Sequence, residues 1–243
     1  AASDVYKRQA ETNRRGTTSR DDKTSLSYFG YLNYVWNDKY AFSGTLRKNG
    51  DSNFGKNVKW GTFGSYGAAW TVSKEEFWKS KVVDFLKLKA SYGTTGNSRF
   101  GSDLSKGIYT YSADYGYGGN TGAIMTTGIN EDLRWEKTYM FNTGIDARIY
   151  KKINVAVEYY NNITKDLINN ALVSMTVGQR AVYRNVGKLK NEGVEVSINS
   201  VNIEKENFSW STSFNLSHNV NKVLELYDGF ERSSGTTIMT EGY

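Results

Sequence analysis

Residues 208–217 read Phe-Ser-Trp-Ser-Thr-Ser-Phe-Asn-Leu-Ser, a regular alternation of bulky side chains or Thr with small polar side chains. Successive side chains of a β-strand point to opposite faces of the sheet. One face of this segment therefore carries Phe208, Trp210, Phe214 and Leu216, while the other carries only Ser and Asn. The pattern predicts a strand with one face against apolar material and one face in water.

The same two-residue period recurs along the rest of the chain. Each such segment is close to the ~10 residues that a tilted strand needs to cross a lipid bilayer. The predicted strands, about eight in all, cover residues 28–36, 40–47, 60–72, 85–97, 135–148, 153–165, 191–202 and 208–219.

The segments that connect these strands alternate in length. Short connections are predicted at 37–39, 150–152 and 203–207, with a middling one at 73–84 in which Lys-Glu-Glu-Phe-Trp-Lys is expected to form a turn of helix. Long loops are predicted at 48–59, 98–134, 166–189 and from 220 onward. If the strands are antiparallel neighbours, all long loops lie at one end, as in an up-and-down transmembrane β-barrel. A soluble sandwich or propeller has no reason to keep this asymmetry.

Composition agrees with a chain made mostly of paired strands. The 243 residues include no Pro, which would remove a donor from a strand ladder, and no Cys, which excludes disulfides. Aromatic residues make up 14% and often fall at predicted strand ends, as interfacial girdles require, although Tyr and Trp favour strands in any β protein. The net charge of +6 is scattered over turns, so no nucleic-acid partner is expected.

Several short motifs follow one another within about residues 25–228: Asn-Gly-Asp-Ser-Asn-Phe-Gly at 49–55, Trp-Gly-Thr-Phe at 60–63, Leu-Lys-Leu-Lys-Ala-Ser-Tyr-Gly-Thr-Thr-Gly-Asn at 86–97, Leu-Arg-Trp-Glu at 133–136, Tyr-Tyr-Asn at 159–161 and Asn-Val-Gly at 185–187. These motifs, in this order, resemble those of SusC/RagA-like TonB-dependent outer-membrane transporters of the Bacteroidetes. One departure is Gly64, where the family often has Pro.

The resemblance implies an all-β, antiparallel, partial barrel in the outer membrane, with about 8 strands of a barrel of about 22 strands and a plugged lumen. It also implies import of an oligosaccharide or peptide, a SusD-like lipoprotein over the extracellular mouth, energy from the TonB complex, and contact with outer-membrane lipid. No enzymatic activity and no cofactor are expected. Residues 25–243 are predicted to be the barrel section, truncated at both ends. Residues 1–24 are predicted to be a non-family leader and loop, of which 1–9 resemble a translated sequencing adaptor.

No catalytic or metal-binding residues are predicted. His218 is the sole histidine, which rules out a triad or multi-histidine site, and it is expected on the lipid side near the outer rim. The acids Asp103, Asp114, Glu131 and Asp132 are expected to be solvated loop residues, since glycosidase chemistry needs two carboxyls at a fixed separation in a cleft. The glycine-rich residues 116–119 lack the lysine and helix of a phosphate loop and are expected to be flexible.

The loop at 98–134 is the predicted ligand-contact segment. Flat aromatic faces beside hydrogen-bonding groups suit sugar rings, although the tyrosines would also serve to pack the loop on itself, on a plug or on a lid. The predicted substrate-binding residues are Tyr109, Tyr111, Tyr115, Tyr117 and Asn120.

Two other classes of protein remain open from the residues alone. A secreted β-rich adhesin or carbohydrate-binding protein would bury the bulky faces between two sheets. A β-rich glycoside hydrolase would need an essential acid among the loop residues.

Overall fold

The computed structural model describes residues 22–98, 105–118, 120–172, 181–226, 232–234 and 237–239. Residues 1–9 and nearly all of the expected leader lie outside these ranges, so that division of the chain stays a prediction. Within the described part, no helix is long and apolar enough to cross a membrane.

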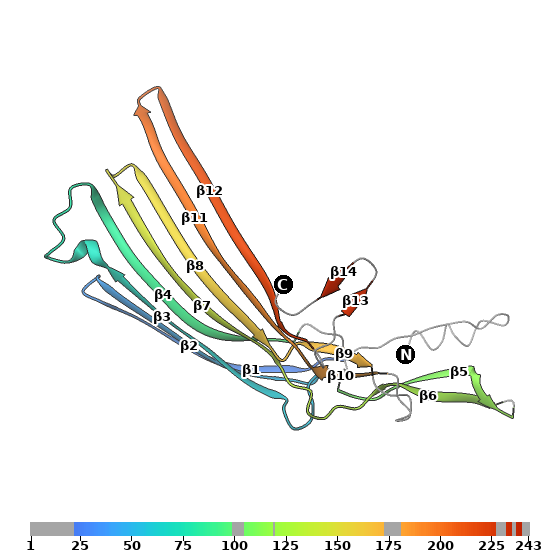
Figure 1. Ribbon diagram of the computed structural model, residues 1–243. Coiled ribbons are helices and arrows are strands. Elements are labelled where there is room, and N and C mark those ends of the chain that lie inside the picture. Colours follow the sequence, from blue (N-terminus) through green and yellow to red (C-terminus); the bar gives the residue numbers. More distant parts are fainter. Residues whose placement is uncertain are drawn as a thin grey trace.

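One antiparallel sheet of eight strands dominates the molecule, and the strands curve together in one direction (Figure 1). Its spatial order, β1-β2-β3-β4-β7-β8-β11-β12, follows the chain without a crossover. All eight predicted strands are confirmed. Their bounds are β1 Ser25–Trp36, β2 Tyr40–Asp51, β3 Trp60–Thr71, β4 Val83–Asn97, β7 Glu136–Ile149, β8 Ile153–Lys165, β11 Lys188–Lys205 and β12 Phe208–Glu225.

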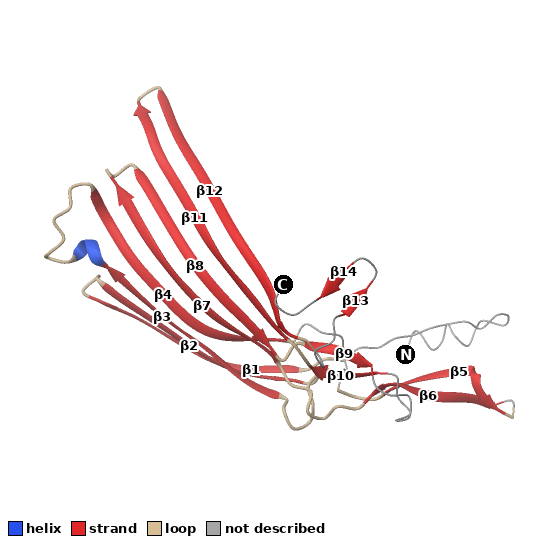
Figure 2. Ribbon diagram, viewed as in Figure 1, coloured by secondary structure: helices blue, strands red, loops and turns tan. Residues whose placement is uncertain are grey.

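The short connections all lie at one end of the sheet, as predicted, and the long segments all lie at the other (Figure 2). Asn37 and Asp38 have φ of 51° and 53°, and Tyr150 and Lys151 have φ of 51° and 57°. Two successive residues with positive φ form the turn that best matches the twist of a hairpin. The β3–β4 connection contains a 3-10 turn, η1 (Val72–Lys74). A helical turn was predicted slightly later, at residues 74–79, so η1 ends at the residue where the predicted turn begins.

The pairing register places most of the bulky side chains of the eight strands on one face, whereas Phe29 and Tyr31 of β1 and Phe63 of β3 lie on the other. Val196 lies opposite Leu216, Ile145 opposite Val157, and Tyr66 opposite Tyr92. We call this face the apolar face and the opposite one the polar face. The described residues leave the apolar side chains largely uncovered, with Leu32 70% and Tyr66 68% exposed. A continuous apolar surface of this size requires an apolar partner.

Two aromatic belts bound the apolar face. Trp70 stacks on Tyr40 at 6.4 Å near the short connections, and Trp60 stacks on Tyr28 at 6.1 Å near the long ones. These tryptophans lie ten residues apart on the same face of β3, or about 34 Å along the strand. At a tilt of about 40° this corresponds to about 26 Å, close to the ~25 Å apolar band of an outer-membrane barrel.

Two of the long connections contain strands that the sequence analysis did not predict. Residues 98–134 and 166–189 contribute β5 (Ile108–Tyr117), β6 (Asn120–Gly128), β9 (Ile168–Leu172) and β10 (Ala181–Asn185) to a second sheet in the order β5-β6-β10-β9. A separate short hairpin pairs β13 (Arg232–Ser234) with β14 (Thr237–Met239). The parallel pairing of β10 with β6 joins segments far apart in sequence, which local alternation does not reveal.

Glu75 fixes the β3–β4 connection to the aromatic belt at the end of the short turns. Its carboxylate accepts hydrogen bonds from Tyr40 Oη at 2.7 Å, Trp70 Nε1 at 3.0 Å and Lys39 Nζ at 3.0 Å. These donors stabilise the ionised form and lower the pKa of Glu75 from 4.5 to about 2, with the Tyr40 bond the largest cause. Because the pKa is lowered in the fold, this stabilisation is complete above the ordinary carboxyl pKa and is lost as pH falls through about 2.

A spin label attached at the exposed position of Glu76 reports how firmly Glu75 holds the connection. In the full-length protein we expect its mobility to stay constant from pH 7 to pH 4 and to rise only as the pH approaches 2. In a Glu75→Gln background the label is expected to be mobile throughout, since an amide attracts Lys39 only weakly. A mobility change centred near pH 4.5 in the parent would contradict the assignment.

Candidate functional site

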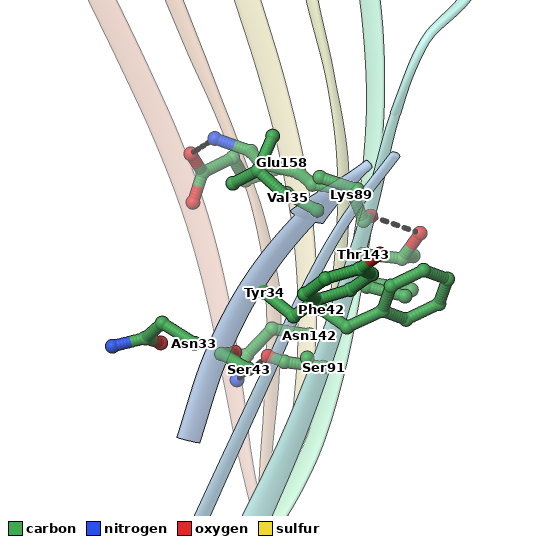
Figure 3. A pocket seen from close by; sticks show the side chains of 15 residues that line it. Asn33, Tyr34, Val35, Phe42, Ser43, Lys89, Ser91, Asn142, Thr143 and Glu158 are labelled. Carbon is green, nitrogen blue, oxygen red and sulfur yellow. Dashed lines mark hydrogen bonds and ion pairs between the residues drawn. The ribbon is translucent and has the colours of Figure 1, made fainter. Parts of the chain in front are cut away.

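The polar face carries an ion cluster at its centre. Lys89 of β4 pairs with Asp146 of β7 at 3.1 Å and also with Glu158 of β8. The same face has a shallow pocket that is lined by Lys89, Glu158, Ser43, Ser91 and Asn142, among others (Figure 3). Two carboxylates and one ammonium leave a net negative charge, which suits a water-filled interior.

A small hydrophobic core lies at the opposite end from the short turns, where the long segments leave the sheet. Trp135 stacks on Phe54 with ring centroids 4.4 Å apart and meets Phe63 edge-on at 5.4 Å. All three are buried, and Ile168 packs against them. We call this group the rim core. It joins the β2–β3 loop to the segment before β7.

Polar contacts hold the β2–β3 loop and the end of β2 to neighbouring segments. Gly55 donates its N–H to the Leu133 carbonyl at 2.8 Å, and the buried Asp51 pairs with Lys23 at 3.3 Å. A Cβ at Gly55 would lie 1.8 Å from the Glu131 carbonyl oxygen, so only glycine fits this approach. The motif at 49–55 thus attaches the β2–β3 loop to the segment before β7.

Two further residues connect the long segments to each other. Glu136 is buried, and its carboxylate accepts the Ile168 N–H at 2.8 Å and the Asn97 side-chain amide at 3.0 Å. Asn185 accepts the Arg134 N–H at 2.9 Å and donates to the carbonyls of Arg134 and Asp166. Residue types alone did not indicate these roles, although both residues lie in motifs that carried the family resemblance.

The predicted ligand-contact residues lie on or beside the β5–β6 hairpin, which projects from the end of the sheet (Figure 1). Tyr109 and Tyr111 pair with Met125 and Ala123 and share one face of the hairpin, 53% and 73% exposed. Tyr117 is 94% exposed and pairs with the exposed Asn120 at the turn, where Gly118 has φ of 64°. Tyr115 belongs to β5, and its side chain lies outside the described part. The structure tests no ligand contact.

The other residues considered from the sequence form no reaction centre in the described part. Glu131 and Asp132 are exposed loop acids, Asp103 lies outside the described residues, and Asp114 lies in β5. Gly116 also lies in β5, so residues 116–118 form a strand end and turn in place of the expected loop, while Gly119 lies outside the described residues.

His218 pairs with Val194 on the apolar face, as predicted. The described residues include no group of three His, Cys, Asp or Glu side chains that would hold a metal.

Removing the Glu136 carboxylate is predicted to weaken the attachment of the long segments to the end of the sheet. Glu136→Ala leaves the Ile168 N–H without its acceptor, at a cost of about 1–3 kcal/mol. We expect faster proteolytic nicking within residues 98–134 and 166–187 of the full-length protein, with the barrel intact. Glu131→Ala makes the same chemical change at an exposed position and serves as the control. Equal cleavage rates in the two variants would refute the role of Glu136.

Comparison with known proteins identifies the family. The family model described as "TonB dependent receptor-like, beta-barrel" matches residues 2–239. TonB-dependent receptor P39 of Formosa agariphila is 38% identical over 93% of this chain and 22% of its own length. TonB-dependent receptor SusC of Bacteroides thetaiotaomicron is 33% identical over 89% of this chain and 22% of its own length. The chain therefore spans about a fifth of the length of these curated relatives.

Solved structures agree with this result. The RagAB peptide importer in its "open-open" state matches 91% of this chain and 24% of its own chain, with a TM-score of 0.83 and 28% identity. The FrpB iron transporter of Neisseria meningitidis is 14% identical with a TM-score of 0.57, which shows the fold alone. The apolar face, the aromatic belts and the one-sided loops are those of a section of outer-membrane barrel wall, and the chain belongs to the TonB-dependent receptor-like β-barrel family, with SusC among its relatives.

Proposed function

We propose that this chain forms part of the barrel wall of a TonB-dependent importer that takes up oligosaccharides or peptides through the outer membrane. In this proposal a SusD-like lipoprotein covers the extracellular mouth, and the TonB complex supplies energy from the inner membrane. The relative SusC and the RagAB peptide importer support this class of function.

The observation that carries the proposal is the separation of the two faces of the eight-stranded sheet. Most bulky side chains of the sheet fall on one face, and the charged Lys89 cluster lies on the other. The apolar face is also left largely uncovered by the described residues, with Leu32 70% and Tyr66 68% exposed, as expected for a sheet that lies between lipid and an aqueous interior. An adhesin or carbohydrate-binding protein built as a sandwich would instead bury the apolar face under a second sheet. The second sheet here continues from the end of the first (Figure 2).

The role of the barrel wall is to bind, guide and release cargo without bond chemistry. No cofactor or metal ion is required for such a role. The exposed acids Glu131 and Asp132 act in this proposal as solvated residues of the extracellular loops.

The β5–β6 hairpin is the part of this chain that we assign to cargo contact. Tyr109 and Tyr111 lie two residues apart on one strand face, about 7 Å along the strand, and both rings are open to solvent. Tyr117 and Asn120 extend the exposed surface to the hairpin tip, and Tyr115 belongs to the same strand. Aromatic faces with neighbouring amides suit the apolar faces and hydroxyl rims of sugars as well as peptide side chains.

The transport proposal is tested in a strain that lacks the gene for the full-length protein. We expect uptake of at least one member of a panel of fluorescent oligosaccharides and peptides to require the gene. A protonophore that collapses the inner-membrane proton gradient is expected to stop this uptake while binding at the surface persists. Uptake of the whole panel without the gene, or uptake that survives the protonophore, would contradict the proposal.

The cargo-contact assignment is tested with the panel member that the uptake assay identifies. Each buried aromatic contact contributes about 1 kcal/mol, so Tyr109→Ala with Tyr111→Ala is expected to weaken binding to the full-length transporter about 30-fold. Tyr115→Ala with Tyr117→Ala is expected to weaken it as well, with assembly and lipoprotein binding unchanged. Tyr150→Ala is the control, because Tyr150 is 62% exposed in a turn at the opposite end of the sheet. Affinity that is the same in all variants would remove the assignment.

A further inference from the structure

The β3–β4 connection differs from the other turns at its end of the sheet. Residues 72–82 join these strands, whereas residues 37–39, 150–152 and 206–207 suffice for the other three hairpins. In Figure 1 the connection projects beyond the strand ends. A tight turn would close this hairpin equally well, so the additional residues call for a separate explanation.

Phe77 of this connection continues the apolar face beyond the end of the strands. Its ring lies 6.5 Å from that of Trp70, edge-on at 66°, and the Phe77 side chain is 64% exposed. Trp70 itself belongs to the apolar face, since it lies opposite Leu88 and Tyr40. The exposed Phe77 ring is therefore on the lipid side of the barrel wall, next to the aromatic belt.

The connection is braced, so the exposed position of Phe77 is built into the fold. Glu75, only 13% exposed at its side chain, is bound by Tyr40, Trp70 and Lys39. Trp78 Nε1 donates to the Val83 carbonyl at 3.0 Å, and the Val83 N–H donates to Ser80 Oγ at 3.1 Å.

Two exposed lysines follow Phe77 in the connection. Lys79 and Lys81 make no ion pair within the described part of the chain, whereas Lys39 pairs with Glu75 and Lys74 lies 3.8 Å from Asp38. With Glu75 neutralised by Lys39, the remaining exposed acid of the connection is Glu76. The tip therefore has a surplus of positive charge beside an exposed aromatic ring.

We propose that this connection is a membrane anchor that binds anionic phospholipid in the periplasmic leaflet of the outer membrane. Phe77 inserts among the upper parts of the acyl chains, where an aromatic ring is favoured at a membrane interface. Lys79 and Lys81 contact the lipid phosphates, toward which basic residues beside a membrane are attracted. Phospholipid is assigned as the binding partner because Phe77 continues the lipid-facing surface and because the positive charges of Lys79 and Lys81 complement the negative phosphates. The inference rests on the family's membrane location and is independent of the cargo.

The insertion of Phe77 is tested with a bimane fluorophore on Phe77→Cys in the full-length protein, reconstituted in vesicles that contain phosphatidylglycerol. We expect spin-labelled lipid chains to quench the fluorophore strongly and aqueous iodide to quench it weakly. The control is a fluorophore on Lys151→Cys in the β7–β8 turn, which we expect iodide to quench. Strong iodide quenching at position 77 would overturn the proposal. So would a fluorophore shielded from both quenchers, which would indicate a protein partner on this surface.

The headgroup contact is tested by how strongly detergent-purified protein retains phosphatidylglycerol relative to phosphatidylcholine. Each lysine near a lipid phosphate contributes about fivefold, so Lys79→Gln and Lys81→Gln are each expected to lower this preference about fivefold. Lys56→Gln removes the same charge from the exposed β2–β3 loop at the other end of the sheet and is expected to leave the preference unchanged. Equal losses in all three variants, or no loss in any, would refute a specific site. Cargo uptake is measured in the same lysine variants. A loss of lipid preference with normal uptake would support the anchor, and the transport proposal would be judged by the uptake assay alone.

Discussion

The structure depends on the two-residue alternation of side chains being held in register across every strand pair of the large sheet. A slip by one residue in any pair would move a whole row of bulky side chains from the apolar face to the polar face. Val157 illustrates the constraint, because it lies opposite Ile145 on one neighbour and Val196 on the other, with all three on the apolar face. Within a bilayer every backbone N–H and C=O must also be paired, which antiparallel ladders achieve.

This constraint explains which features were predictable from sequence. The strand 208–219 was found because Phe214 and Leu216 alternate with serines and asparagines, and β12 then continues to Glu225 at the end with the long segments. The strands β9 and β10 were missed, since each has five residues, and their sheet forms through a parallel pairing with β6 that local pattern does not contain. The tyrosines of β5 keep to every second position, but the irregular pairing with β6 between Ser112 and Tyr117 is not visible in the sequence.

The motifs that carried the family resemblance have structural roles at the rim. Phe54 and Trp135 build the rim core, Gly55 permits the close approach of the β2–β3 loop, and Glu136 and Asn185 join the long segments. Their residue types did not indicate these roles, because a buried carboxylate that accepts a distant backbone N–H resembles any other Glu in a sequence. The rim thus holds the second sheet, and with it the exposed tyrosines, in a fixed relation to the strands that cross the membrane.

The decisive measurement is which medium touches each face of β12 in the full-length protein in a bilayer. Nitroxide labels placed one at a time at Ser213, Phe214, Asn215 and Leu216 would be relaxed by oxygen, which concentrates in acyl chains, or by a water-soluble nickel chelate. We expect preferential relaxation by oxygen at Phe214 and Leu216 and a lower oxygen response at Ser213 and Asn215. Labels at Phe214 and Leu216 that respond to nickel, or to neither reagent, would contradict this expectation.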